Sequence, residues 1–225
     1  MNGNKTLLAE MAGILGEVKT ENKVALCVPF TMLCDKKMPF ALGAQDVSCH
    51  AKGAFTGEIS GAMLSEAGAK YVIVGHSERR AYHNETNEIV CAKAEMAMEN
   101  GIVPIICVGE TMQEKNEGKT FDVIKTAIFE SVPKNVQKSI IIAYEPRWAI
   151  GAGITPTRQE IAEVHKFIAE TLVKMGLGGT PVLYGASVNG ANVADIVSIE
   201  NVDGVLVGGA SLKPQDFVLI INNAK

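Results

Sequence analysis

Residues 71–80 are YVIVGHSERR, four apolar residues followed at once by a glycine and five polar side chains. An apolar run without alternation is typical of a strand that is buried on both faces, as in a parallel sheet covered by helices. The polar residues would then lie at the carboxyl end of that strand. This pattern indicates the fold class, because it recurs along the chain.

Apolar runs of this kind are spread over the 225 residues, and segments with helical periodicity lie between them, including 88–98, 121–129 and 160–175. Strand followed by helix, repeated, predicts the α/β class. No linker or shift in composition divides the chain, so we expect one domain over residues 1–225. The predicted strands are 24–28, a weaker run at 40–44, 71–74, 104–108, 140–144, 181–184 and 204–207.

Polar or glycine residues follow the runs, and the carboxyl ends of the strands are where a (β/α) barrel places its chemistry. We therefore expect a (β/α)8 barrel. Residues 6–15 have the pattern of an amphipathic helix, and no strand is written before them. Seven strands are thus expected where eight would close the barrel, with the first strand missing.

Composition narrows the class of protein. Hydrophobic residues make up 47% of the chain and the net charge is −4, which gives no general attraction to nucleic acid or to anionic membranes. Because no apolar run is long enough to span a bilayer, a cytoplasmic protein is expected. The five cysteines form no CxxC pair and are interpreted as reduced thiols.

Two side chains at strand ends are candidates for catalysis. His76 directly follows the run 71–74, where its imidazole could face a substrate oxygen. Glu145 ends the run 140–144, whose apolar residues would partly desolvate the carboxylate and help it to act as a base. Each has a structural alternative: a histidine alone is more often structural, and a strand-end carboxylate often only binds a loop or an ion-pair partner.

Two glycine-containing segments could contact an anion. Residues 146–155 resemble a movable lid, with a rigid start at Pro146, an apolar tip and small residues that absorb dihedral change. An ordinary loop with Trp148 as a core residue is the alternative. Residues 208–211, GGAS, follow a predicted strand and precede a helical turn, which favours phosphate binding by backbone N–H groups.

Six strings, taken together and in order, resemble the triosephosphate isomerase family across nearly the whole chain. They are GAFTGE at 53–58, VGHSERR at 74–80, CVGET at 107–111, AYEP at 143–146 with WAIG at 148–151, YGASV at 184–188 and VGGASL at 207–212.

The resemblance implies an isomerase that interconverts dihydroxyacetone phosphate and glyceraldehyde 3-phosphate through an enediolate, in glycolysis and gluconeogenesis. It implies that Glu145 is the base, that His76 is the electrophile, and that Glu78 is a second carboxylate near the site or else a structural ion-pair partner. The residues implied to grip the substrate phosphate are Gly151, Ser187, Gly208 and Gly209. No metal or organic cofactor is implied.

The resemblance also implies a homodimer, with the tip around Thr56 inserted into a pocket of the neighbouring subunit. We expect no nucleic-acid or membrane partner.

The chain departs from the family pattern at several positions. It starts inside the family's opening motif Asn-Trp-Lys-Met-Asn-Gly, so that the motif's lysine is absent, and Lys5 is the nearest cation. The leading interpretation is an isomerase whose sequence begins at an internal methionine. Smaller departures, which put turnover in doubt, are Arg147, Ala152, Ile154 and Ala186.

Two other interpretations stay open at this point. The first is a catalytically impaired relative that has lost the lysine and binds phosphorylated metabolites or a protein partner. The second is another phosphate-binding barrel enzyme, such as a sugar-phosphate aldolase or synthase, because a fold does not fix function. The second is disfavoured, because no lysine occupies a strand-end position suited to Schiff-base chemistry.

Overall fold

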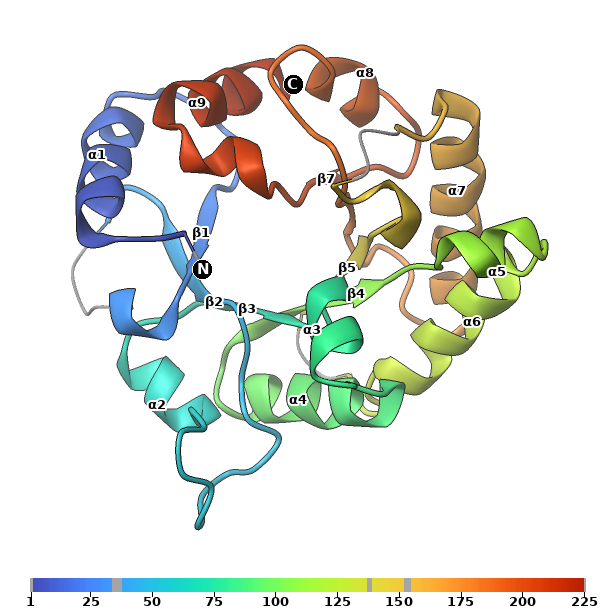
Figure 1. The fold of residues 1–225 in the computed structure, drawn as a ribbon, viewed down its shortest axis with the longest axis horizontal. Coiled ribbons are helices and arrows are strands. Elements are labelled where there is room, and N and C mark those ends of the chain that lie inside the picture. The colour runs from blue at the N-terminus through green and yellow to red at the C-terminus, as the bar shows by residue number, and fades with distance from the viewer. Residues whose placement is uncertain (1, 34–37, 137–138, 152–154, 225) are drawn as a thin grey trace.

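The computed structural model describes residues 2–33, 38–136, 139–151 and 155–224. Within them, seven parallel strands form one curled sheet in chain order, and the helices lie around its outside (Figure 1). The predicted α/β barrel class is therefore confirmed. The strands are β1 (Ala25–Val28), β2 (Ala41–Ala44), β3 (Tyr71–Val74), β4 (Val103–Val108), β5 (Ile141–Tyr144), β6 (Val182–Tyr184) and β7 (Gly204–Val205).

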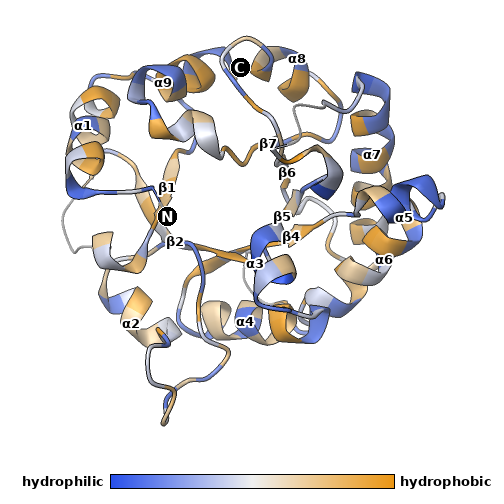
Figure 2. Cartoon of the chain, in the orientation of Figure 1, coloured by the Kyte–Doolittle hydropathy of each residue, from blue (hydrophilic) through white to orange (hydrophobic). Residues whose placement is uncertain are grey.

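The helices alternate with the strands. They are α1 (Lys5–Gly16), α2 (Gly61–Glu66), α3 (Ser77–Tyr82), α4 (Asn87–Glu99), α5 (Met112–Asn116), α6 (Thr120–Ser131), α7 (Arg158–Lys174), α8 (Val193–Val197) and α9 (Pro214–Asn223), with 3-10 turns η1 (Phe30–Met32), η2 (Arg147–Ala149) and η3 (Gly209–Leu212). Local sequence explains their starts: capping boxes pair Thr111 with Glu114 at α5 and Thr157 with Glu160 at α7. Figure 2 shows α5 as mostly hydrophilic, and none of its residues is buried.

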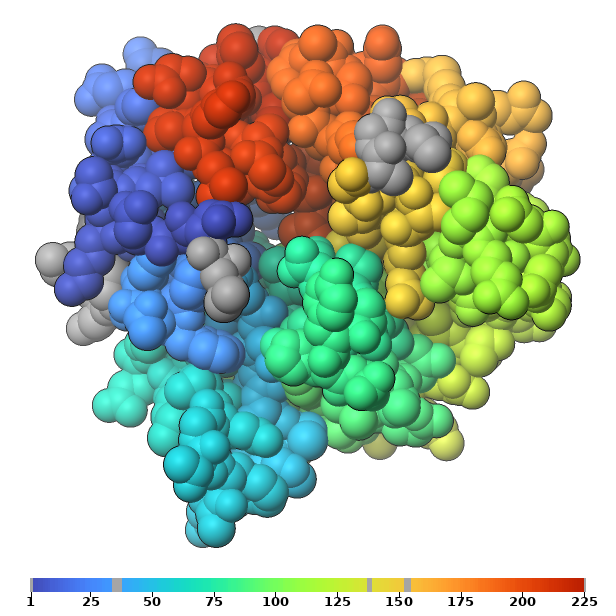
Figure 3. All heavy atoms as spheres, in the orientation of Figure 1, coloured from blue at the N-terminus to red at the C-terminus, as the bar shows by residue number. Residues whose placement is uncertain are grey.

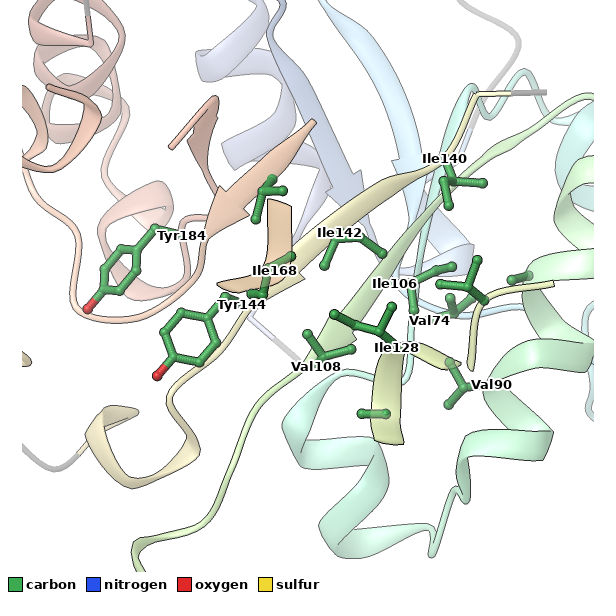
Figure 4. Packing of buried hydrophobic residues seen from close by; sticks show 14 of the residues in the cluster. Val74, Val90, Ile106, Val108, Ile128, Ile140, Ile142, Tyr144, Ile168 and Tyr184 are labelled. Atoms are coloured by element: carbon green, nitrogen blue, oxygen red, sulfur yellow. The ribbon is translucent and has the colours of Figure 1, made fainter. Parts of the chain in front are cut away.

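Most of the core lies between the sheet and the helices. Alternate residues of β4 point to opposite faces. Ile106 packs outward with Val90 of α4 and Ile128 of α6 (Figure 4), whereas Ile105 and Cys107 belong to a smaller cluster with Ala143. Because both faces of the strands are covered, the strands appear in the sequence as continuous apolar runs.

The two edge strands of the sheet do not pair with each other in the described part of the chain. Helices α1 and α9 pack side by side along this edge (Figure 1), and Met11, Val28 and Phe217 share an apolar cluster there. The side-chain amide of Asn22 donates hydrogen bonds to the carbonyls of Ile221 and Ala224. The prediction of a strand over 204–207 was too long, because only Gly204–Val205 has strand geometry.

The segment between β2 and α2 projects beyond the ring of helices (Figures 1 and 3). Within it the rings of His50 and Phe55 stack with centroids 3.7 Å apart, and Phe55 is 41% exposed. Thr56, the residue expected at a dimer contact, is exposed in this projection.

Candidate active site

The two predicted catalytic side chains meet at the carboxyl ends of β3 and β5. The Nε2 atom of His76 lies 3.0 Å from Oε1 of Glu145. The backbone N–H of Ser77 donates to Oε2 of the same carboxylate at 3.0 Å, and Glu145 is only 3% exposed. A buried carboxylate thus shares the site with an imidazole, and both of its oxygens have a donor.

Hydrogen bonding favours one tautomer of His76. This residue caps the N-terminus of α3, and its Nδ1 atom accepts the backbone N–H of Glu78 at 3.3 Å. A nitrogen that accepts carries no proton, so the neutral ring holds its proton on Nε2, where it can be donated. Burial would lower the pKa of His76, but the hydrogen bond and negative charge of Glu145 outweigh burial, and the pKa is raised.

The carboxylate of Glu78 lies at the margin of this pair. Its Oε2 atom is 3.8 Å from Nδ1 of His76, and the side chain is 72% exposed. Its charge adds to the rise in the pKa of His76. Glu78 therefore contacts His76 by its backbone and through its charge, and it lies largely in solvent.

Two glycines let Glu145 occupy its place. A Cβ added to Gly109 would fall 1.8 Å from the carbonyl oxygen of Glu145, and one added to Gly185 would fall 3.1 Å from its Cγ. Any side chain at Gly109 would therefore displace the backbone of Glu145. The sequence places Gly109 only within the string CVGET at 107–111 and does not indicate this contact, which joins residues far apart in the chain.

Glu110 anchors the segment after Glu145, and its role was not predicted. It is 1% exposed, and its Oε1 atom accepts from Trp148 Nε1 at 2.8 Å and from the hydroxyl of Tyr144 at 3.3 Å. The ammonium of Lys115 lies 3.4 Å from the centroid of the Trp148 ring. Burial raises the pKa of Glu110, although these hydrogen bonds oppose the rise.

A buried ionic cluster braces α3, the helix that His76 caps, and it too was not predicted. Arg79 of α3 pairs with Asp46 at 2.8 Å and with Glu85 at 2.6 Å, and Lys93 of α4 pairs with Asp46 at 2.7 Å. Burial would raise the pKa of Glu85, but its bonds to Lys93 and Arg79 lower it. No pattern in the sequence connects these residues, which come from different elements.

The residues predicted to hold phosphate follow the neighbouring strands β5, β6 and β7. Gly151 is exposed with φ of 68°, and half-buried Ser187 lies between β6 and α8. Gly208 and Gly209 begin the η3 turn, and a Cβ added to either would meet nothing within 4 Å. These positions therefore share one edge of the sheet and leave open space beside the backbone.

Two of the positions expected to depart from the family pattern follow strands at this edge. Arg147 is half-buried in the η2 turn, and Ala186 packs against the core. Ala152 and Ile154 lie outside the described residues. Lys5 is the exposed first residue of α1, and no hydrogen bond or ion pair of its side chain is found in the described part of the chain.

Two further findings concern metal ions and membranes. In the part of the chain that the structure describes, no group of three or more His, Cys, Asp and Glu side chains could hold a metal ion. No helix among the described residues is long and apolar enough to cross a membrane.

The fold and the site define a (β/α)-barrel enzyme with a buried carboxylate and an imidazole beside a glycine-lined edge. The family model of triosephosphate isomerase matches residues 1–224. The chain is 45% identical to the triosephosphate isomerase of Afipia carboxidovorans and 46% identical to that of Hyphomonas neptunium; in both cases 98% of this chain is covered, with 92% and 93% of the relative. A crystal structure of triosephosphate isomerase from Bartonella henselae matches with a TM-score of 0.87 and 37% identity, over 99% of this chain and 94% of that one.

The chain belongs to the triosephosphate isomerase family. This membership excludes the aldolase or synthase interpretation. It also argues against an impaired relative, since curated proteins that are 42–46% identical over 98% of the chain are named triosephosphate isomerases.

Proposed function

We propose that this protein interconverts dihydroxyacetone phosphate and glyceraldehyde 3-phosphate by proton transfer through an enediolate, as a step of glycolysis and gluconeogenesis. Membership of the family supports this reaction. The observation that carries the assignment of residues is the 3.0 Å contact between Glu145 and His76, inside a site where Glu145 is 3% exposed.

Glu145 is the base in this proposal. Its carboxylate must leave the N–H of Ser77 and the ring of His76 before it can take a proton from a substrate carbon. Burial keeps bulk water away from the carboxylate, so the carboxylate can contact the substrate carbon directly. The same carboxylate then returns the proton to the neighbouring carbon, which completes the isomerisation.

His76 is the electrophile. With Nδ1 accepting from Glu78, the Nε2–H group can turn its hydrogen bond from Glu145 to a substrate carbonyl oxygen. That bond strengthens as negative charge develops on the oxygen, so it lowers the barrier to proton removal. Glu78 contributes by fixing the ring of His76 through its backbone N–H.

The phosphate group lies at the edge formed by Gly151, Ser187, Gly208 and Gly209. Free space beside Gly208 and Gly209 lets an anion approach the backbone closely. The segment that starts at Pro146 acts as a lid, which excludes water so that the enediolate does not expel phosphate. The side chains placed here can carry out this proton transfer without a metal or an organic cofactor.

We also propose a single-domain subunit that forms a homodimer in the cytoplasm. The unbroken order of strands in one sheet supports a single domain. The projecting segment around Thr56 and the 79% exposure of Tyr82 support an interface between copies. The described cysteines are free thiols, as suits a reducing compartment. Light scattering at micromolar concentration should give the mass of a dimer, and a monomeric mass would exclude it.

The decisive experiment replaces the base. Glu145→Gln should lower kcat by about 10²–10⁴-fold while substrate binding stays within a few fold, because a base acts chiefly in the transition state. A coupled assay measures turnover, and exchange of the substrate carbon proton with solvent measures the chemical step. Turnover at the wild-type rate in this variant would refute the assignment of Glu145.

A further inference from the structure

A cavity of about 410 Å³ opens beside the active site, between the helices and the η2 turn. Arg80 of α3, Lys119 and Asp122 at the start of α6, and Arg147 of η2 line it. Neither His76 nor Glu145 lines it, nor does any residue proposed to hold the substrate phosphate. Gly109, whose other side contacts Glu145, forms part of its wall, so the cavity is adjacent to the active site but separate from it. In Figure 3, α3, α5, α6 and the gold η2 segment surround this part of the visible face.

Two arginines line this cavity, and neither guanidinium group has an ion pair with a carboxylate in the described part of the chain. Arg80 donates to the carbonyls of Gly75 and Cys107 and to the side chains of Asn87 and Ser131, all of them uncharged. These bonds use four of its five N–H groups. No hydrogen bond or ion pair of the Arg147 side chain is found among the described residues.

Some of the other charged residues that line the cavity already have partners outside it. Lys119 pairs with Glu117 at 2.6 Å in an exposed contact that contributes little and can be exchanged. Glu114 lines the cavity, but its Oε2 atom accepts two hydrogen bonds from Thr111 in the capping box of α5. Asp122 is the other carboxylate in the wall. The cavity therefore holds more positive than negative charge.

Like charges in one cavity raise the free energy of the empty site. Burial lowers the pKa of Arg80, and the nearby charge of Arg147 lowers it further. An anion between the two groups would offset this repulsion. The planar guanidinium fork of Arg147 matches the oxygens of a phosphate group, and Arg80 can add its one remaining N–H.

We propose that the cavity binds a phosphate dianion, either the free ion or the phosphoryl group of a small phosphomonoester, between Arg147 and Arg80 with Lys119 as a third cation. The backbone N–H of Arg147 donates to the carbonyl of Glu110 at 3.0 Å, where the lid segment begins. An anion bound there joins η2 to the start of α6 and so restrains the first turn of the lid.

The test is a titration of the full chain with inorganic phosphate, followed by NMR. The backbone amides of Thr126 and Ala127 report on the cavity that they line, and those of Gly208 and Gly209 report on the active site. We expect both sets to shift saturably, the cavity set with a Kd on the order of 1 mM. Since binding is measured directly, the result does not depend on the proposed isomerase activity.

Variants distinguish a specific phosphate site from general electrostatic attraction of phosphate to the protein. Arg147→Gln should weaken the cavity titration by about tenfold, since it removes a charge-assisted hydrogen bond. Asp122→Asn should tighten it about two- to threefold by removing a repulsive carboxylate. Lys125→Gln, which removes an exposed cation from the same helix but outside the cavity, should leave it unchanged.

The proposal would be overturned if Thr126 and Ala127 showed no shift up to about 20 mM phosphate, far above the expected Kd. Equal affinity in Arg147→Gln, or equal weakening by Lys125→Gln, would overturn it as well. A parallel titration with glycerol 3-phosphate distinguishes the two sources, since tighter binding of the ester assigns the site to phosphomonoesters and tighter binding of the ion assigns it to free phosphate. Displacement of either by uncharged glycerol would also overturn it.

Discussion

The two parts of the active site rest on different kinds of backbone. His76 and Glu145 follow β3 and β5, which flank the six-residue strand β4, and their side chains contact each other and the backbone of α3. Gly208 and Gly209 follow β7, which has two residues, and have free space around them. The groups proposed to move protons are held tightly before any substrate binds, whereas the proposed phosphate edge is left for the ligand to complete.

This difference predicts that substitutions in the two parts change different kinetic constants. Changes in the tightly held part should lower kcat, because they misplace groups that act in the transition state. Changes at the open edge should raise KM, because they alter contacts that the ground state also makes. Variants in each part test whether kcat and KM respond separately.

After Glu145→Gln, the largest effect is expected for His76→Ala. Removing the donor to the developing oxyanion should lower kcat by about 10²–10³-fold and raise KM much less. Steady-state kinetics in the coupled assay separate the two constants. Weaker substrate binding with unchanged kcat would contradict the electrophile role and would erase the distinction between the two parts.

Gly109→Ala tests whether packing alone holds Glu145 in place. Because its Cβ would fall 1.8 Å from the carbonyl oxygen of Glu145, the backbone must move. We expect a loss of about 1–3 kcal/mol in the free energy of unfolding, as in overpacked cores. A shift of about 1 Å in the base should also lower kcat by about 10²-fold.

Urea unfolding and kinetics on the same preparation check Gly109→Ala. Gly118→Ala is a matched control for stability, because its added Cβ has no neighbour within 4 Å, although its φ of 68° carries some strain of its own. A Gly109→Ala enzyme with normal kcat would show that Glu145 tolerates movement.

The edge of the sheet near β1 and α9 lies far from the residues proposed to carry out the chemistry. Asn22→Ala removes the two hydrogen bonds to Ile221 and Ala224 that hold the end of α9. We expect a loss of about 1–2 kcal/mol in the free energy of unfolding, from about 1 kcal/mol per net hydrogen bond. The kcat of the folded enzyme should not change. A fall in kcat would mean that this edge helps to shape the site.

A smaller effect is expected at the open edge for Gly209→Ala. The added methyl group meets nothing within 4 Å, so the fold should be unaffected. It would occupy space that an approaching phosphate needs, and KM should rise a few fold while kcat stays nearly constant. Circular dichroism confirms the fold. An unchanged KM would show that phosphate does not approach the backbone at this residue.

Much of the fold could be predicted from the sequence, because strands buried on both faces appear as continuous apolar runs. The strand predicted over 140–144 is found at Ile141–Tyr144, and the helix expected at 6–15 is found at Lys5–Gly16. The run 204–207 was predicted too long, since the apolar residues Leu206 and Val207 follow Val205, the last paired residue of β7. Short helices such as α5 and α8, of five residues each, span less than two helical turns, so the period does not repeat and cannot be detected.

For parts of the site, the sequence indicated which residues take part but not how they contact one another. The positions of His76 and Glu145 at strand ends were visible, but their 3.0 Å contact depends on how β3, β4 and β5 are paired. The bond from Trp148 to Glu110 joins residues 38 positions apart, and nothing local in either segment indicates it. Such contacts arise from the register of the sheet, which a single sequence does not specify.

The smallest effect concerns the proton on His76, and it tests how closely the two catalytic groups are coupled. The hydrogen bond and charge of Glu145 raise the pKa of His76 against the lowering effect of burial, and Glu78 contributes less. Glu145→Gln should therefore lower the pKa of His76, and Glu78→Gln should lower it by a smaller amount. The pKa of His165, which burial lowers to about 4, should be the same in all three proteins and serves as an internal control. NMR titration of the ring protons, assigned with His76→Ala, measures each value.

The raised pKa of His76 also predicts how stability depends on pH. A raised folded-state pKa stabilises the protein below the unfolded value of about 6.5, and this contribution is lost as the pH rises through the folded value. The wild type should thus lose stability relative to Glu145→Gln over that interval. An unchanged pKa of His76 in Glu145→Gln would mean that the 3.0 Å contact does not persist in solution, and that the proposed proton-transfer groups are no more fixed than the phosphate edge.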